Sequence, residues 1–416
     1  MRRTLIASGL AVLAGISALA QGFGNDQHGG RGTSEVGALT ARADDPTAVS
    51  VNPAGIARSK AFQLQLGADF GLSVDRYEST SGSFQADHTI GLEPAFYATW
   101  ELSGPLVIGV ALDSPWRHVT DWNNALFPHR FESRLEHVDL KMLHAVIAAS
   151  AGDHWSFGGG PAYVRGTLEN GDNALIDAPG SGGPLVVEIG REAKATVDGL
   201  GFDAGVQGTW EHWGVGAVIR SPVDLAGSGR TSYRAFSPPD DPVLRAYLAS
   251  TFASSSTSQH LHLPLELDAG FWMGRGALVW ELDLTCRRWS GFEEKTSYSA
   301  DPFARGTRIS GSGWDDTVGA RAALEAKLGG GFTVHGGVAY DPSPVPEDRF
   351  DPGFPSGDAF VTGAGFSYHV NNTTFDVGYS IRFSKDVTVA EPGAPPTRGT
   401  FSSDEQVWAA SARFRL

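Results

Sequence analysis

The stretch that organises this chain reads Asp44-Asp45-Pro46-Thr47-Ala48-Val49-Ser50-Val51-Asn52-Pro53-Ala54-Gly55. It follows a glycine-rich segment and precedes a long run of strand-like segments. Asn52 and Pro53 favour a turn, because asparagine side chains accept hydrogen bonds from nearby backbone amides and proline fixes φ. The stretch has neither the alternation of a strand nor the length of a stable helix. We therefore interpret residues 21–60 as a compact plug around which residues 61–416 close.

Residues 1–20 have the pattern of a secretory signal peptide. Two arginines precede an apolar run from Leu5 to Leu19, and small residues occupy the cleavage positions in Ala18-Leu19-Ala20. The run is too short, and too rich in glycine and serine, for a membrane span. We expect the mature chain to begin at Gln21; the alternative is an uncleaved anchor helix.

The composition favours strands over helices. The 416 residues include 53 glycines and 11 tryptophans, and only 19% are charged. After the leader, no segment has the ~18 consecutive apolar residues of a transmembrane helix, whereas a β-barrel crosses a membrane without one. The formal net charge of -15 argues against a nucleic-acid partner. The single cysteine, Cys286, forms no internal disulfide.

Apolar residues alternate with polar or small ones along most of the mature chain, which is the pattern of strands with two different faces. The predicted strands are 61–72, 89–102, 105–113, 131–150, 153–168, 193–211, 213–224, 259–273, 276–289, 312–328, 331–341, 358–369, 373–385 and 403–416. That makes about fourteen, an even number, as a closed single-chain barrel prefers. We therefore predict an all-β transmembrane antiparallel barrel with the plug inside its lumen.

The connections between these strands alternate strictly between short and long. The long ones are 73–88, 114–130, 169–192, 225–258, 290–311, 342–357 and 386–402. Outer-membrane barrels have short periplasmic turns and long external loops, and a soluble sandwich does not segregate its loops in this way. The rhythm therefore places both ends of the barrel and the plug on the periplasmic side. Within one long loop, residues 238–248 have the pattern of a short amphipathic helix.

The two faces of each predicted strand differ in polarity. In the strand 259–273 the leucines at 261, 263, 265 and 267 share one face, and two histidines and two acids share the other. A charged residue costs about 2–4 kcal/mol on the lipid side at mid-depth, so we expect the leucines to face lipid and the charged face to line the lumen. A soluble barrel would reverse the faces, but the lumen of fourteen strands is too wide for side chains to fill.

Several motifs together resemble those of one known family. They are Gly30-Arg31-Gly32, Ala43-Asp44-Asp45-Pro46, Asn52-Pro53-Ala54-Gly55, Arg220-Ser221-Pro222, Asp283-Leu284-Thr285, Trp289-Ser290-Gly291-Phe292, Trp314-Asp315-Asp316-Thr317, Gly337-Val338-Ala339-Tyr340-Asp341-Pro342-Ser343-Pro344-Val345-Pro346 and Phe366-Ser367-Tyr368. In this order they are similar to the FadL-type outer-membrane transporters for long-chain fatty acids and other hydrophobic compounds. The family usually ends in phenylalanine, whereas here Phe414 is followed by Arg415-Leu416.

The resemblance implies a monomeric barrel in the outer membrane of a Gram-negative bacterium. It also implies a hatch that blocks the lumen, an external hydrophobic groove and sideways exit of substrate through the barrel wall. Asn52, Pro53 and Ala54 match the family's hatch motif, and we expect them where the hatch meets the wall; the alternative is a turn that only ends the plug. The expected partners are hydrophobic small molecules, outer-membrane lipid and lipopolysaccharide, and the barrel assembly machinery.

Alternation places four cations on the lumen side of the wall, namely Arg220, Arg321, Lys327 and Arg382. A fatty acid carries a carboxylate, and arginine offers a planar fork of donors that binds one. The alternative is that these cations pair with acids of the lumen, as buried charges require. For each single cation we favour the pairing, and we expect at least one of the four to face a ligand.

The loop after the third predicted strand carries four large apolar residues, Trp116, Trp122, Leu126 and Phe127. As an external collecting groove, these side chains would shelter an alkyl tail and gain roughly 0.8 kcal/mol for each buried CH₂ group. Tryptophan also gathers at the depth of the lipid headgroups, so an interfacial aromatic girdle is an equal alternative.

We expect no metal, no cofactor and no enzyme activity. His260 and His262 share a strand face, but no third ligand is spaced near them, and no Gly-x-Ser-x-Gly elbow marks a hydrolase. The sequence therefore predicts a passive channel for hydrophobic molecules, foremost long-chain fatty acids. The alternatives are a channel of the same fold for aromatic hydrocarbons, or a non-transport surface barrel such as an adhesin or a lipid-modifying enzyme.

Overall fold

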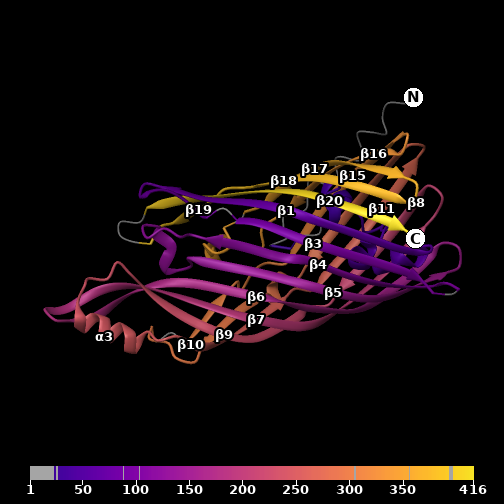
Figure 1. Ribbon diagram of the computed structural model, residues 1–416. Coiled ribbons are helices and arrows are strands. Elements are labelled where there is room, and N and C mark those ends of the chain that lie inside the picture. The colour runs from indigo at the N-terminus through magenta and orange to yellow at the C-terminus, as the bar shows by residue number, and fades with distance from the viewer. Residues whose placement is uncertain are drawn as a thin grey trace.

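The computed structural model describes residues 23–24, 27–87, 89–102, 104–303, 306–355, 357–392 and 397–416. The predicted signal peptide, residues 1–20, lies outside these described residues. Strands dominate the described part of the chain and run obliquely around one long cylinder (Figure 1). None of the described helices has the length and apolar character that crossing a bilayer requires.

Fourteen of the described strands form one closed antiparallel barrel. They are β1 (Phe62–Ser79), β3 (Thr89–Glu101), β4 (Leu106–Asp121), β5 (Leu135–Ala151), β6 (Trp155–Gly180), β7 (Gly183–Thr209), β8 (Trp213–Arg220), β11 (Glu266–Arg275), β12 (Leu278–Arg287), β15 (Thr317–Gly329), β16 (Phe332–Asp341), β17 (Ala359–Val370), β18 (Thr373–Ser384) and β20 (Arg398–Arg415). The sheet closes because β20 pairs with both β18 and β1. The prediction of a closed barrel of about fourteen strands is confirmed.

The short connections all lie at one end of the barrel. At this short-turn end, the Leu416 amide donates to the Phe62 carbonyl oxygen at 2.9 Å, so both ends of the barrel chain meet there. Figure 1 shows the opposite, long-loop end at the left, where β6, β7 and β9 reach beyond the other strands. The predicted segregation of short and long connections is confirmed.

Several predicted loops contain regular structure instead. The additional elements are β2 (Gly82–Gln85), β9 (Val223–Phe236), β10 (Ser255–Leu263), β13 (Glu293–Tyr298), β14 (Thr307–Ser310), β19 (Val387–Ala390), the helix α3 (Pro242–Thr251) and the 3₁₀ turns η3 (Pro128–Phe131), η4 (Trp289–Gly291) and η5 (Glu347–Arg349). The loop predicted at 169–192 is wrong, because β6 and β7 stay paired up to the turn between Gly180 and Gly183. That hairpin is stabilised by packing, since Val187 and Ile189 bury their side chains with Leu244 of α3.

The predicted helix at 238–248 is confirmed in α3. Its first turn is fixed by Asp241, whose carboxylate accepts hydrogen bonds from the Val243 and Leu244 amides, and by Pro242 at the first helical position. The predicted strand 259–273 is in two parts, β10 and β11, on either side of Pro264. Proline has no N–H to donate to the ladder and therefore interrupts it.

This break changes which leucines face lipid. Leu267 in β11 is exposed on the outer face, as predicted, but Leu261 and Leu263 in β10 are buried in the interior. The predicted lipid-facing row is therefore wrong for these two residues. The phase of the alternation shifts by one residue at Pro264, and such a shift moves every later side chain to the other face. In β18, where no proline intervenes, Phe375 and Val377 face outward and Asp376 is buried, as predicted.

Residues 27–59, which we call the hatch, lie in the barrel and touch its wall on all sides. They form α1 (Gly29–Ser34), α2 (Ala48–Val51) and η2 (Pro53–Arg58). The helix α1 packs on β16, β17, β18 and β20, and η2 packs on β4 to β7. Val49 and Ile56 are fully buried against wall residues such as Tyr97 and Val146. Burying each such aliphatic side chain contributes roughly 1.5–3 kcal/mol. Apolar packing therefore holds the hatch in addition to the polar contacts.

Glycines on the inner face of the wall let the hatch backbone approach closely. A Cβ added to Gly205 would lie 2.1 Å from Asn52 Oδ1, and one added to Gly158 would lie 2.4 Å from the Pro53 carbonyl oxygen. A Cβ at Gly378 would lie 2.1 Å from the Gly30 carbonyl oxygen. These distances are far below van der Waals contact, so the fit between hatch and wall requires glycine at these wall positions.

We therefore predict that Gly205→Ala loosens the hatch. Overpacking of this kind costs about 1–3 kcal/mol. The measurement is trypsin cleavage after Arg42, which is buried in the seated hatch, in protein refolded into lipid vesicles. We expect faster cleavage in the variant. Gly71→Ala is the matched control, because no atom lies within 4 Å of a Cβ added at that inward position. Equal cleavage rates in the two variants would contradict the close fit.

Candidate functional site

A buried ion network fixes the hatch to one side of the wall. The Glu35 carboxylate, fully buried in the hatch, accepts from Arg42 Nη2 at 2.6 Å and contacts His335 Nδ1 of β16 at 2.7 Å. Arg42 also donates to Glu325 of β15 at 3.0 Å. Burial, the largest effect, raises the pKa of Glu35, but Arg42, Arg31 and His335 together lower it to about 2. The network therefore keeps this carboxylate charged at neutral pH.

Two acids of β12 bind the hatch backbone. The Thr40 amide donates to Asp283 Oδ2 at 2.8 Å, and the Ala41 amide donates to Glu281 Oε1 at 2.7 Å. On the strand β7, Gln207 Nε2 donates to the Ala41 carbonyl oxygen at 2.8 Å. The wall thus satisfies backbone groups that the irregular hatch cannot pair within itself, as buried polar groups require.

The predicted hatch residues Asn52, Pro53 and Ala54 lie where the hatch meets the wall. Asn52 Oδ1 accepts from the Ala54 amide at 3.1 Å and so caps the turn η2. Its Nδ2 donates to the Thr40 carbonyl oxygen at 2.8 Å and to the Val206 carbonyl oxygen of β7 at 3.3 Å. Asn52 therefore ties two parts of the hatch to the wall, and does more than end a turn.

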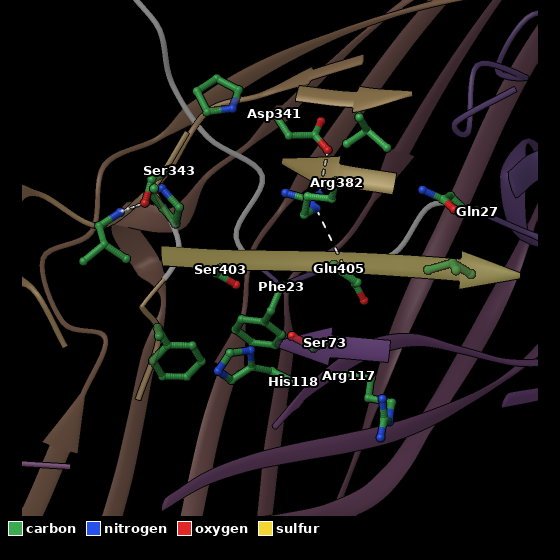
Figure 2. A pocket seen from close by; sticks show the side chains of 18 of the residues that line it. Phe23, Gln27, Ser73, Arg117, His118, Asp341, Ser343, Arg382, Ser403 and Glu405 are labelled. Atoms are coloured by element: carbon green, nitrogen blue, oxygen red, sulfur yellow. Dashed lines mark hydrogen bonds and ion pairs between the residues drawn. The ribbon is translucent and has the colours of Figure 1, made fainter. Parts of the chain in front are cut away.

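A pocket lies in the lumen on the long-loop side of the hatch, with about 1240 Å³ of empty space that is partly open to solvent. Figure 2 shows Phe23 and His118 on one side and Arg382 and Glu405 on the other. Aromatic and aliphatic side chains therefore line the same space as charged ones.

Two of the four predicted lumen cations line this pocket. Arg382 Nη2 donates to Asp341 at 2.7 Å, and Arg321 lies 3.9 Å from the same carboxylate (Figure 2 shows the Arg382 pair). The Glu405 carboxylate lies 3.8 Å from Arg382 Nε, which is beyond hydrogen-bond distance. The expected pairing with lumen acids is therefore present, and one edge of the Arg382 fork is only loosely engaged.

The other two predicted cations lie elsewhere. Arg220 pairs with Asp268 of β11, and its Nη2 donates to the Ser50 and Val51 carbonyl oxygens at 2.9 and 2.7 Å, so it holds the hatch. Lys327 lies near the short-turn end of β15 with 63% of its side chain exposed. The structure brings neither residue to the pocket.

The four predicted groove residues are also separated. Trp116 is buried in the lumen against Phe23 and Trp289. Trp122 and Phe127 stack on each other, with ring centroids 4.4 Å apart, inside an aromatic cluster at the long-loop end. Leu126 alone is exposed, at 76%. The loop therefore forms a packed cap over the barrel, and three of its four large apolar residues present no open surface.

A second, more polar pocket lies among the external loops. It is lined by Arg191, Arg308 and Arg349 among others and shares Trp314 with the lumen pocket. Trp314 stacks on Phe292, with ring centroids 4.5 Å apart. Trp314 therefore lies at the common boundary of the two pockets.

The backbone ladder between β3 and β4 is interrupted, and we call this interruption the window. Pairing of the two strands is limited to Phe96–Glu101 with Val107–Leu112. Beyond this point, residues 89–95 of β3 pair with β1 and residues 113–121 of β4 pair with β5. Ser114 and Pro115 form a bulge there, since the register of β4 shifts between Asp113 and Trp116. The window ends where the Asp87 amide donates to the Asp121 carbonyl oxygen at 2.8 Å.

Hatch residues lie directly behind this window. Ser50 Oγ donates to Asp113 Oδ2 at 2.6 Å, and His28 Nδ1 lies 3.3 Å from the same oxygen. A small cavity at this place is lined by His28, Tyr97 and Ser114 among others. Nearby, Gly24 makes an isolated β-bridge with Trp116, so the start of the described chain pairs with β4. The hatch, the pocket and the window therefore adjoin one another.

One group of side chains in the described chain has the geometry of a metal site. Ligand atoms of Glu35, Glu325 and His335 lie within 4.8 Å of one another. Arg42 donates to both carboxylates, at 2.6 and 3.0 Å. A guanidinium already occupies the position that a cation would need, so these residues do not fit a metal.

Sequence reasoning missed several residues of the site. Phe23 and Phe354 stack with ring centroids 5.5 Å apart and line the lumen pocket, and Glu93 and Arg117 lie at the window. Phe23 precedes the quoted hatch motif, and Phe354 belongs to a long loop. The signal for the window was present in Ser114-Pro115, because proline inside a strand indicates a bulge or an edge.

The sequence matches the profile of one protein family, described as outer membrane protein transport protein (OMPP1/FadL/TodX), over residues 11–416. The chain belongs to this family. It is therefore an outer-membrane protein of Gram-negative bacteria and carries hydrophobic compounds. Its place in a family of transport proteins confirms the prediction that it is not an enzyme.

Solved structures similar to this chain have the same fold. A Pseudomonas aeruginosa FadL homologue is 17% identical with a TM-score of 0.79, and the alignment covers 96% of this chain and 100% of that one. The P. putida toluene transporter TodX is 14% identical, with a TM-score of 0.69 and coverage of 94% and 100%. The Ralstonia pickettii toluene transporter TbuX is 14% identical, with a TM-score of 0.66 and coverage of 94% and 99%. A comparison with curated protein sequences gives no match.

We predict that the hatch leaves its seat in acid. The pKa of Glu35 is lowered from 4.5 to about 2, so its ion pairs stabilise the hatch fully above pH 4.5 and are lost as the pH falls through 2. The measurement is the conductance of single molecules in planar bilayers between pH 7 and pH 2. We expect conductance to rise over that interval in the wild type.

The variant Glu35→Gln tests the contribution of Glu35 to the pH response separately from that of the other acids. It leaves two buried arginines with one partner fewer, which costs about 3–5 kcal/mol. We expect high conductance already at pH 7 and a weaker rise on acidification. Glu211→Gln is the control, because that carboxylate is 88% exposed at the short-turn end. A pH profile in Glu35→Gln identical to the wild type would contradict the proposed role of Glu35.

Proposed function

We propose that this channel carries long-chain fatty acids. The observation that carries the proposal is the lumen pocket, in which the loosely engaged edge of Arg382 faces the same space as Phe23, Phe354 and Val345. A fatty acid has both matching parts, because its carboxylate suits the guanidinium fork and its alkyl chain suits the apolar side chains. Each CH₂ group removed from water adds roughly 0.8 kcal/mol.

Access is from the external pocket. Three arginines and three acids line it together, and Trp314, which stacks on Phe292, borders both this pocket and the lumen pocket. Because Trp122 and Phe127 are buried, we no longer place the collecting surface on the loop 114–130, where the sequence analysis expected it. No energy source is required, because a hydrophobic molecule moves down its own concentration gradient.

Exit is through the window between β3 and β4. Around it, Ile90 and Leu92 face lipid with 64% and 67% exposed side chains, so a molecule that passes the window reaches the bilayer directly. The hatch closes the alternative path along the barrel axis, since the Glu35 network and the wall glycines hold it on all sides. Movement of the hatch near His28 and Ser50 then controls the window.

A second candidate substrate is a small aromatic hydrocarbon. Two of the similar solved structures are named as toluene transporters. In this chain, Phe23 lies among Trp116, Trp289, Phe292 and Phe354, with ring centroids 5.5 to 5.6 Å away. Such a cluster suits a flat apolar ring, which needs no anchor for a charge.

Uptake measurements separate the two substrates. Cells that lack other transporters of this type are given radiolabelled oleate or radiolabelled toluene, with and without the expressed chain. We expect expression to increase oleate uptake. An increase for toluene alone would favour the aromatic rival, and no increase for either compound, with the protein correctly inserted, would contradict transport of both.

The variant Arg382→Gln tests the carboxylate anchor. A hydrogen bond to a charged group contributes about 1.5–3 kcal/mol, so we expect oleate uptake at low concentration to fall by roughly tenfold and toluene uptake to stay unchanged. Arg245→Gln is the matched control, because that arginine lies on α3 at the surface and pairs with Asp240. An equal loss for both compounds would show that Arg382 supports only the fold.

A further inference from the structure

The window between β3 and β4 is closed by side chains where the backbone ladder is missing. Arg117 Nε of β4 lies 3.0 Å from Glu93 Oε1 of β3, and Lys141 of β5 donates to Glu93 Oε2. The Arg117 guanidinium lies over Gly91, where an added Cβ would be 2.3 Å from its Nη1. Two cations from two strands therefore converge on one carboxylate across the gap.

This triad connects the two sides of the wall. Arg117 lines the lumen pocket (Figure 2), whereas Lys141 is 41% exposed on the outer face and also lies 3.1 Å from Asp139. Glu93 comes from the inner face of β3, between the lipid-facing residues Leu92 and Pro94. A molecule that moves from the pocket to lipid through the window must separate Glu93 from one or both cations.

Separating Glu93 from Arg117 and Lys141 is unfavourable when no other carboxylate takes its place. A cation that faces lipid without a partner costs a large part of its hydration free energy, and breaking a partly buried pair exposes such a charge. A ligand carboxylate removes this cost, because it can take the place of Glu93 on Arg117 and then on Lys141. A neutral hydrocarbon offers no such exchange.

We propose that Glu93, Arg117 and Lys141 form a charge latch that opens the window by exchange of one carboxylate for another. The latch makes the exit selective for anionic amphiphiles over neutral molecules of the same length. This inference rests on the proposed transport of long-chain fatty acids and adds the residues that decide which headgroup leaves. No covalent step is involved, and both cations stay paired throughout the exchange.

The test compares two probes of equal chain length, radiolabelled oleate and radiolabelled oleyl alcohol, in cells that express the chain. In the wild type we expect a higher uptake rate for oleate. In Glu93→Gln the latch holds no charge pair, so uptake of the alcohol rises by about fivefold, which is the effect of roughly 1 kcal/mol. The ratio of oleate to alcohol uptake therefore falls.

Two further variants separate selectivity from folding. The double variant Arg117→Gln/Lys141→Gln removes the receiving cations, and we expect the ratio to fall there through lower oleate uptake. Glu93→Asp keeps the carboxylate, and we expect it to retain most of the wild-type ratio. Insertion of each variant is checked by the shift in gel mobility between heated and unheated samples.

Glu169→Gln is the matched control. Glu169 pairs with Lys194 at 2.7 Å on the outer face, where β6 and β7 have a continuous ladder, so its loss leaves the ratio unchanged. An unchanged ratio in Glu93→Gln and in the double variant, with oleate uptake intact, overturns the latch alone. If the wild type increases uptake of neither probe, the proposed function fails and the latch fails with it.

Discussion

The structure depends on one constraint, which is that backbone N–H and C=O groups in a bilayer must find partners within the protein. A closed antiparallel barrel meets this constraint, and the pairing of β20 with β1 removes the last free edge. Where the ladder is interrupted, other groups must compensate. Between β3 and β4 the bulge at Ser114-Pro115 leaves residues 89–95 and 113–121 without mutual pairing, and side chains, hatch residues and the chain near Gly24 fill the gap. The place where the constraint is met least regularly is also the place where we propose that a molecule leaves the lumen.

The backbone groups of the hatch are also buried and also need hydrogen-bond partners. Its short helices and turns cannot pair all their own backbone groups, so the wall supplies Asp283, Glu281 and Gln207 as partners. Glycines such as Gly205 and Gly378 allow the approach that these hydrogen bonds need. Acids and arginines of hatch and wall form a buried network around Glu35, and this network is strong only while every member keeps its partner. The hatch is therefore held by many short contacts, yet a change of charge at one of them affects all the others.

The barrel could be predicted from the sequence because each strand carries its own evidence. Alternation such as Phe375-Asp376-Val377 indicates which face of the strand contacts lipid, and the motif at Asn52-Pro53-Ala54 indicates the hatch. Prediction failed where a proline shifts the phase of a strand and where packing at a distance decides. Leu261 and Leu263 face inward because Pro264 shifts the phase of the strand, and Trp122 is buried because it packs on Phe401, which lies far along the chain. The triad of Glu93, Arg117 and Lys141 joins three strands. Ser114-Pro115 signals a bulge in one of them, but no local pattern shows which side chains meet across the gap.

We propose that substrate leaves sideways between β3 and β4 and does not pass along the axis through the hatch. The most direct test is photo-labelling of the protein in lipid vesicles with a long-chain fatty acid that carries a diazirine on its chain, followed by mass spectrometry of the labelled peptides. Our account predicts labels on pocket residues such as Phe23 and on window residues such as Ala95 and Ser114. Labels on Gly55, Ser59 and Thr209, which line a cavity between the hatch and the wall at the short-turn end, with none at the window, would contradict it.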